Sequence, residues 1–392
     1  MRIRGLRARD VLSRATLAVA AVSVLAACTG GMAAESAPQI QEPASTTTAT
    51  PSATPSTTAT PTPDSDLAPV PLKPGETPPQ FIVTSFDGAG SLDEWQRWLD
   101  VSRRADAGMT FFLSGPYLVP RDKRTLYHPP GHPVGSADIN FSNEADIQKR
   151  MEFVRRAYMA GNEIGTHYNG HFCGQVGGAA WNTAEWSNEL DQFYSFLDNW
   201  RTNADAPDAA PMPFGDKAIV GERTPCLEGR RDAFLPVLAA HGFRYDSSGD
   251  GDLRWPHKFA NGMWDIPMQE LRLAGTNSSV LSMDYNFFLA QSGGRDLGGA
   301  LQDGLERQTL DTYRHAYQAL RNGNRAPLIL GDHFDRFNDG IYLDALSKFL
   351  LETCHNPGTR CVSFKELTDW LDVQTPGTIA QFQARPVQQM SR

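Results

Sequence analysis

The chain has 392 residues, with 45 Asp and Glu against 36 Lys and Arg and a formal net charge of −9. An acidic chain repels phosphate groups, so nucleic acid and anionic lipid headgroups are excluded as expected partners.

The first 28 residues have the pattern of an export signal. Five arginines lie among the first 14 residues, and the apolar run 15–27 that follows is too short to span a bilayer as a mature helix. The run ends in Leu-Ala-Ala-Cys at 25–28, which resembles the lipobox of bacterial lipoproteins. This resemblance implies cleavage before Cys28 and a lipid on its sulfur. An ordinary secretory signal with a chance cysteine is the alternative.

Removal of residues 1–27, which carry five Arg and one Asp, would change the net charge from −9 to −13. We therefore expect membrane contact through the lipid on Cys28 alone, at the outer face of the bacterial cell membrane. Residues 28–79 are rich in Ala, Ser, Thr and Pro and bury too little apolar surface to fold. Because proline keeps such a segment extended, it is interpreted as a tether.

The segment 80–373 is long for one domain but suits an α/β barrel, and a polar tail is expected at 374–392. Short β-rich runs alternate with helical patterns, which favours a largely parallel sheet or barrel with polar site residues just after the strands. Helical patterns include 93–107, 145–161, 183–200 (with Thr183 as its cap) and 312–323. Strands are expected at 81–86, 109–115, 163–167, 218–225, 243–248, 263–268, 326–333 and 360–364.

Four cysteines remain after Cys28, and an even number in an exported chain favours disulfides. Cys354 and Cys361 flank a turn-rich loop and are candidates for a local disulfide, which would leave Cys173 and Cys226 to pair. Four cysteines allow three connectivities, and the spacing does not choose among them. Buried free thiols are the alternative.

Two histidines form a candidate metal site. His167 and His171 follow a predicted strand at a spacing of four residues, which brings two imidazoles to one face if the chain turns helically there. His128 and His132 share this spacing, but two prolines between them oppose a helix, so they are interpreted as loop residues.

Several motifs occur in an order that resembles the NodB-homology domain of carbohydrate esterase family 4, the polysaccharide deacetylases. VTSFDGAG, MTFFLSG and AGNEIGTHYNGH are followed by GERTP at 221–225 and by the stretch 324–333. YDSS at 245–248, WP at 255–256 and IPM at 266–268 resemble the chitin deacetylase branch. The resemblance covers about 80–373 and implies a deformed (β/α) barrel of the α/β class. It also implies hydrolysis of N-acetyl groups on a GlcNAc-containing polysaccharide, peptidoglycan or chitin-like, with a divalent metal, usually zinc. Nothing in the sequence argues for an oligomer, so a monomer is expected.

The resemblance also implies roles for individual residues. His167 and His171 would bind the metal. Asp87 would be the base and Arg223 its ion-pair partner, while His333 would protonate the leaving amine. In this family a carboxylate near the fourth motif holds the acid histidine, and the candidates here are Asp246, Asp250 and Asp252, with Asp246 preferred.

The first motif departs from the family pattern of two consecutive aspartates, base and then metal ligand. Asp87 is followed by Gly88, which has no side chain to coordinate an ion. Three outcomes are open: Asp87 itself binds the metal, the two histidines bind it more weakly with water, or the site is inert. The resemblance therefore predicts a metal-dependent N-deacetylase at the cell surface. A non-catalytic glycan-binding lipoprotein is the alternative, and another metal hydrolase on the same fold is the third possibility.

Overall fold

The computed structural model describes residues 69–390. The predictions for the signal segment, for Cys28 and for the tether up to residue 68 lie outside these residues. Within 69–390, no helix is both long and apolar enough to cross a membrane.

A curled, mostly parallel sheet forms the centre of the fold. Strand β1 (Gln80–Gly88) pairs in parallel with β2 (Met109–Leu113), with β11 (Leu328–His333) and, over its first half, with β12 (Thr359–Val362). Beyond β2 the order continues through β3 (Glu163–Thr166), β4 (Gly221–Glu222), β5 (Tyr245–Asp246) and β8 (Trp264–Asp265) to the antiparallel edge strand β7 (His257–Lys258). A smaller sheet combines β6 (Asp250–Gly251), β9 (Met268–Arg272) and β10 (Ser279–Leu281).

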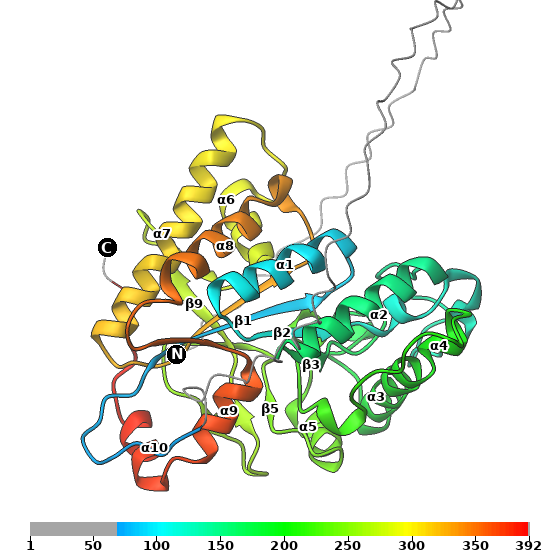
Figure 1. Ribbon diagram of the computed structural model, residues 1–392, viewed down its shortest axis with the longest axis horizontal. Coiled ribbons are helices and arrows are strands. Elements are labelled where there is room, and N and C mark those ends of the chain that lie inside the picture. The colour runs from blue at the N-terminus through cyan, green and yellow to red at the C-terminus, as the bar shows by residue number, and fades with distance from the viewer. Residues whose placement is uncertain (1–68, 391–392) are drawn as a thin grey trace, which may run out of the picture. The chain divides into compact units, whose positions relative to one another are not determined.

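Helices cover the outside of the sheet, and four of them, α2, α1, α8 and α7, contact one another in that order (Figure 1). This arrangement confirms the predicted α/β fold of the deformed (β/α) barrel type. The helices are α1 (Leu92–Ala105), α2 (Glu144–Met159), α3 (Thr183–Asp198), α4 (Trp200–Asn203), α5 (Arg231–Ala240), α6 (Asp284–Ser292), α7 (Ala300–Asn322), α8 (Ile341–Thr353), α9 (Phe364–Asp372) and α10 (Pro376–Gln383).

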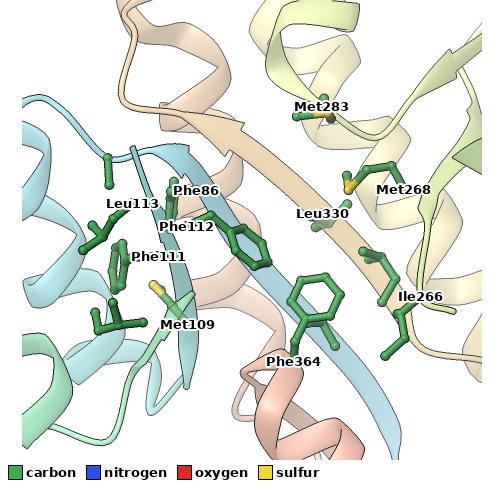
Figure 2. Packing of buried hydrophobic residues seen from close by; sticks show 14 of the residues in the cluster. Phe86, Met109, Phe111, Phe112, Leu113, Ile266, Met268, Met283, Leu330 and Phe364 are labelled. Carbon is green, nitrogen blue, oxygen red and sulfur yellow. The ribbon is translucent and has the colours of Figure 1, made fainter. Parts of the chain in front are cut away.

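Strand β2 shows how side chains are divided between the two faces of the sheet. Successive residues of a strand point to opposite faces. Phe111 packs outward against Trp95 of α1, with ring centroids 4.4 Å apart, whereas Phe112 points inward to Phe364, at 5.8 Å (Figure 2). Both faces are buried, which explains why the strands read as nearly continuous apolar runs.

Several elements differ from their sequence predictions. Helix α7 begins at Ala300 rather than at 312, and the helix over 183–200 is capped by Asn182 instead of Thr183. The hairpin β9–β10 and helix α6 were not predicted. The segment 374–392, expected to be a polar tail, contains α10, whose Phe382 is buried against Trp255 at 4.4 Å.

Two disulfides form, Cys173–Cys226 and Cys354–Cys361. Of the three connectivities that the sequence left open, the structure has the one in which Cys354 and Cys361 form the local disulfide. The first disulfide joins two loops that follow β3 and β4, and the second lies between α8 and β12.

Candidate active site

The predicted site residues meet at the carboxyl ends of the parallel strands. Asp87 and His333 are directly paired in register at the ends of β1 and β11. Thr166 pairs with Glu222, so the residues that follow them, His167 and Arg223, also become neighbours. Asp87, His167, His171 and His333 line one cavity of about 600 Å³.

Arg223, which does not line the cavity, orients the side chain of Asp87. Its Nη1 donates hydrogen bonds to Asp87 Oδ1 at 2.7 Å and to Ser85 Oγ at 2.9 Å, while Nη2 donates to Ser247 Oγ at 2.9 Å. The side chains of Arg223 and Asp87 are 0% and 2% exposed. Burial alone would raise the pKa of Asp87, but the positive charges of Arg223 and His333 outweigh it and hold this pKa below its usual value. Asp87 is therefore an ionised carboxylate with a fixed orientation.

His333 is held by Asp284, a residue that the sequence did not indicate. Its Nδ1–H donates to Asp284 Oδ1 at 2.7 Å, and its backbone N–H donates to Oδ2 at 2.8 Å. Burial would lower the pKa of His333, but the fully buried Asp284 carboxylate raises it to about 9. His333 is therefore protonated at neutral pH and can act as a proton donor.

Asp246, predicted to orient His333, does not do so. Strands β1 to β4 lie between β5, which carries Asp246, and β11, which carries His333. The Oδ1 of Asp246 instead accepts the backbone N–H of Ser248 at 2.6 Å. The other two candidates, Asp250 and Asp252, line a separate cavity of about 460 Å³.

The signal that could have identified Asp284 is its position at the junction between a strand and a helix. Asp284 is the first residue of α6, and the preceding Met283 forms a parallel bridge with Gly331 of β11. This bridge aligns the junction with the end of β11. The segment 269–311 gave no clear pattern in the sequence, so the junction was not recognised.

His167 presents an unpartnered nitrogen to the cavity. Its Nδ1–H donates to the backbone oxygen of Arg223 at 2.8 Å, and its buried Nε2 has no hydrogen-bond partner among residues 69–390. Burial lowers the pKa of His167 to about 3, so the ring is neutral and Nε2 carries a free lone pair. The ring of His171 lies 5.2 Å away between centroids, and burial lowers the pKa of this histidine too.

These two neutral imidazoles fit part of a metal site. A buried lone pair without a partner is a costly arrangement that a bound ion would satisfy. Among residues 69–390, however, the three-residue cluster with ligand atoms within 4.8 Å of one another is His171, Cys173 and Cys226. Asp87 does not complete a cluster with both histidines, and its Oδ1 is held by Arg223. The side chains therefore provide two histidine ligands and lack an assembled third.

The backbone conformation at residue 88 favours glycine. Its φ is +74°, a conformation that side chains other than Asn and Asp rarely adopt. A Cβ at this position would lie 3.4 Å from Cε2 of Tyr117, in ordinary contact. Tyr117 thus lines the cavity beside the place where an aspartate would stand.

The segment 117–142 between β2 and α2, here called the insert, contributes to the rim of the cavity. Tyr117, Asp138 and Ile139 line it, and the backbone N–H of Asp138 donates to Gly170 O at 2.8 Å. Met283 also lines the cavity, as does Tyr285, which is 45% exposed. His128 and His132 lie in the insert outside regular helices, as predicted, and do not line this cavity.

No protein-family model matches the chain, and no curated protein matches it. Solved structures do match. A Mycobacterium smegmatis protein provisionally named a polysaccharide deacetylase is 17% identical, over 83% of this chain and 97% of its own, with a TM-score of 0.47. An allantoinase is 14% identical over 75% and 91%, with a TM-score of 0.45. A carbohydrate esterase family 4 pseudoenzyme from Bacillus anthracis is 11% identical over 78% and 71%, with a TM-score of 0.40. Likenesses at this level transfer no activity to this chain.

Proposed function

We propose that this protein is a polysaccharide N-deacetylase, a hydrolase that removes N-acetyl groups from a GlcNAc-containing polymer. The observation that carries the proposal is the pairing of Asp87 with His333. These residues hold opposite protonation states at directly paired positions of adjacent strands, and both line the cavity. The motif order that resembles carbohydrate esterase family 4 supports the same chemistry.

Hydrolysis of an acetamide needs a base for the attacking water and an acid for the departing amine. Asp87 accepts the proton of a water molecule, and Arg223 keeps the carboxylate ionised and oriented. His333 donates its proton to the amine nitrogen, and Asp284 stabilises the imidazolium beforehand. Each proton transfer contributes about 10²–10⁴-fold to the rate. A divalent metal, zinc in view of the imidazole ligands, would polarise the acetyl carbonyl when held by His167 and His171.

Acetate release from chitin oligomers and from peptidoglycan, with zinc supplied, tests this function. We expect His333→Gln to lose about 10²–10⁴-fold in activity. The matched control is His315→Gln, because His315 is an exposed histidine on α7. A wild-type protein that releases no acetate from either polymer, with zinc present and the fold intact, would contradict the proposal.

A non-catalytic glycan-binding lipoprotein is the second candidate function. The missing third metal ligand favours it, because an inert site would keep the cavity and lose the Lewis acid. Binding of chitin oligomers with no acetate released, unchanged by His333→Gln, would establish this function instead.

The location at the cell surface is a further part of the proposal. It rests on the resemblance of residues 25–28 to a lipobox and on the tether composition of 28–79. Replacing Cys28 with Ser should move the protein from the membrane fraction to the surrounding medium. An unchanged distribution would show that Cys28 is not the anchor.

A further inference from the structure

The wall of the cavity next to His171 is built by two loops that are fastened together. The disulfide Cys173–Cys226 joins the loop after β3 to the loop after β4. A hydrogen bond from the backbone N–H of Gly174 to Glu228 Oε2, 2.5 Å long, reinforces the junction. The Nδ1 atom of His171 lies 3.8 Å from the sulfur of Cys173 and 3.9 Å from that of Cys226.

We propose that reduction of this disulfide turns His171, Cys173 and Cys226 into a metal site for a thiophilic divalent ion such as zinc. The three ligand atoms, one imidazole nitrogen and two sulfurs, already lie within 4.8 Å of one another. Two thiolates and one imidazole form a ligand set that zinc uses with an open fourth position. That position can be filled from the cavity, because His171 and Cys226 line it. The site does not depend on the deacetylase function.

The disulfide is accessible to a reductant. Cys226 is exposed and Cys173 is half-buried, whereas Cys361 in the other disulfide is only 6% exposed. Exposed disulfides are the more readily reduced ones. In thiol–disulfide exchange a dithiol breaks the S–S bond, delivers two electrons and two protons to the cysteines, and leaves as its own disulfide. A divalent ion then displaces the two thiol protons.

The new site competes with the two-histidine site described above. A neutral imidazole has one free lone pair, and the other ring nitrogen carries the proton. If Nδ1 of His171 binds an ion beside the two sulfurs, Nε2 becomes an N–H group and cannot bind an ion together with His167. The disulfide form therefore leaves Nε2 of His171 available to the cavity, and the dithiol form withdraws it.

Cobalt(II) is a suitable probe because sulfur ligands give it a charge-transfer absorption in the near ultraviolet. The experiment uses the Cys354→Ser/Cys361→Ser variant, in which Cys173–Cys226 is the remaining disulfide of the described domain. After reduction with a phosphine, we expect cobalt to produce the sulfur band, and the oxidised protein to produce none. Adding His171→Gln should weaken cobalt and zinc binding by more than about 10-fold.

The mirror variant, Cys173→Ser/Cys226→Ser, keeps the other disulfide and should give no band after the same reduction. The proposal is overturned if the reduced Cys354→Ser/Cys361→Ser protein gives no band although thiol titration finds both sulfhydryls free and circular dichroism shows a folded chain. It is equally overturned if His171→Gln leaves the affinity for cobalt unchanged. Neither outcome bears on acetate release, so a failure here is separate from a failure of the proposed function.

Discussion

Two groups of residues at the cavity, here called its two halves, differ in how fully their side chains are hydrogen-bonded. One, here called the acid–base half, consists of Asp87, Arg223, Asp284 and His333. The other, the metal half, consists of Gly88, His167 and His171. In the acid–base half, each titrating side chain has a charged partner at 2.7 Å. In the metal half, within the part of the chain that the structure describes, His167 Nε2 has no hydrogen-bond partner and His171 Nδ1 lies 3.8 and 3.9 Å from the sulfurs of Cys173 and Cys226.

This difference shows what the chain supplies by itself. The orientation and charge of Asp87 and His333 are set by the protein itself, because their partners Arg223 and Asp284 are side chains of the same fold. In the proposed mechanism the Lewis acid would be a bound metal ion, and two histidines hold an ion more weakly than the three protein ligands of a typical catalytic zinc site. If the protein is the deacetylase proposed above, we expect the supply of this ion to limit the activity more than the protonation states of Asp87 and His333.

The largest expected effect is a loss of protein stability when an ion pair of the acid–base half is broken. Arg223→Met would leave the Asp87 carboxylate buried without its cation, and removal of one partner of a buried ion pair costs about 3–5 kcal/mol. Denaturant unfolding measures this loss. The control is Arg103→Met, because Arg103 is 73% exposed in its pair with Asp100 and should change stability by less than about 0.5 kcal/mol. Equal losses of stability in the two variants would contradict the description of Arg223 and Asp87 as a buried ion pair.

The second effect depends on pH. Because the pKa of His333 is raised from 6.5 to about 9 in the folded protein, its pairing with Asp284 stabilises the fold fully below pH 6.5 and is lost as the pH rises through 9. The pKa difference corresponds to about 3 kcal/mol. Asp284→Asn should therefore destabilise the protein by about 3 kcal/mol near pH 6 and by much less above pH 9.

The control for this pH dependence is Asp344→Asn, which removes a partly exposed carboxylate from its ion pair with Arg97. Its effect should stay below about 1 kcal/mol at every pH. A difference between Asp284→Asn and the wild type that does not change between pH 6 and pH 9 would show that Asp284 does not set the pKa of His333. A titration of the His333 ring by NMR gives the same answer independently.

The sequence predicted the residues of the cavity better than their partners. Asp87 and His333 lie at the ends of strands and His167 directly follows one. The apolar runs of these strands are visible in the sequence, and the motif order identified the three residues. Asp284 could not be found in this way, because it precedes His333 by 49 residues and its role depends on the bridge between Met283 and Gly331. Which strands become neighbours is a property of the fold, and spacing along the chain does not specify it.

The end of the domain was missed for a different reason. Phe382 is one of few apolar residues in a polar stretch, so 374–392 has no strong hydrophobic pattern. The contact of Phe382 with Trp255 and Trp370 supplies the burial that makes α10 part of the domain. Local patterns predict elements that have an apolar face of their own, and they fail where one side chain does most of the packing.

The smallest expected effect is on the zinc affinity of the metal half. Gly88→Asp supplies the carboxylate that the family pattern has at this position, and it should strengthen zinc binding by at least about 10-fold. Gly88→Asn is the matched control, because Asn meets the same φ of +74° and the same contact with Tyr117 but offers a neutral amide. Both variants should lose about 1 kcal/mol of stability from the backbone conformation. Calorimetric titration with zinc measures the affinity of both variants. Tighter binding in Gly88→Asp alone would mean that the missing carboxylate at position 88 accounts for the incomplete metal half. Equal affinities in both variants would mean that the metal half differs in more than Gly88.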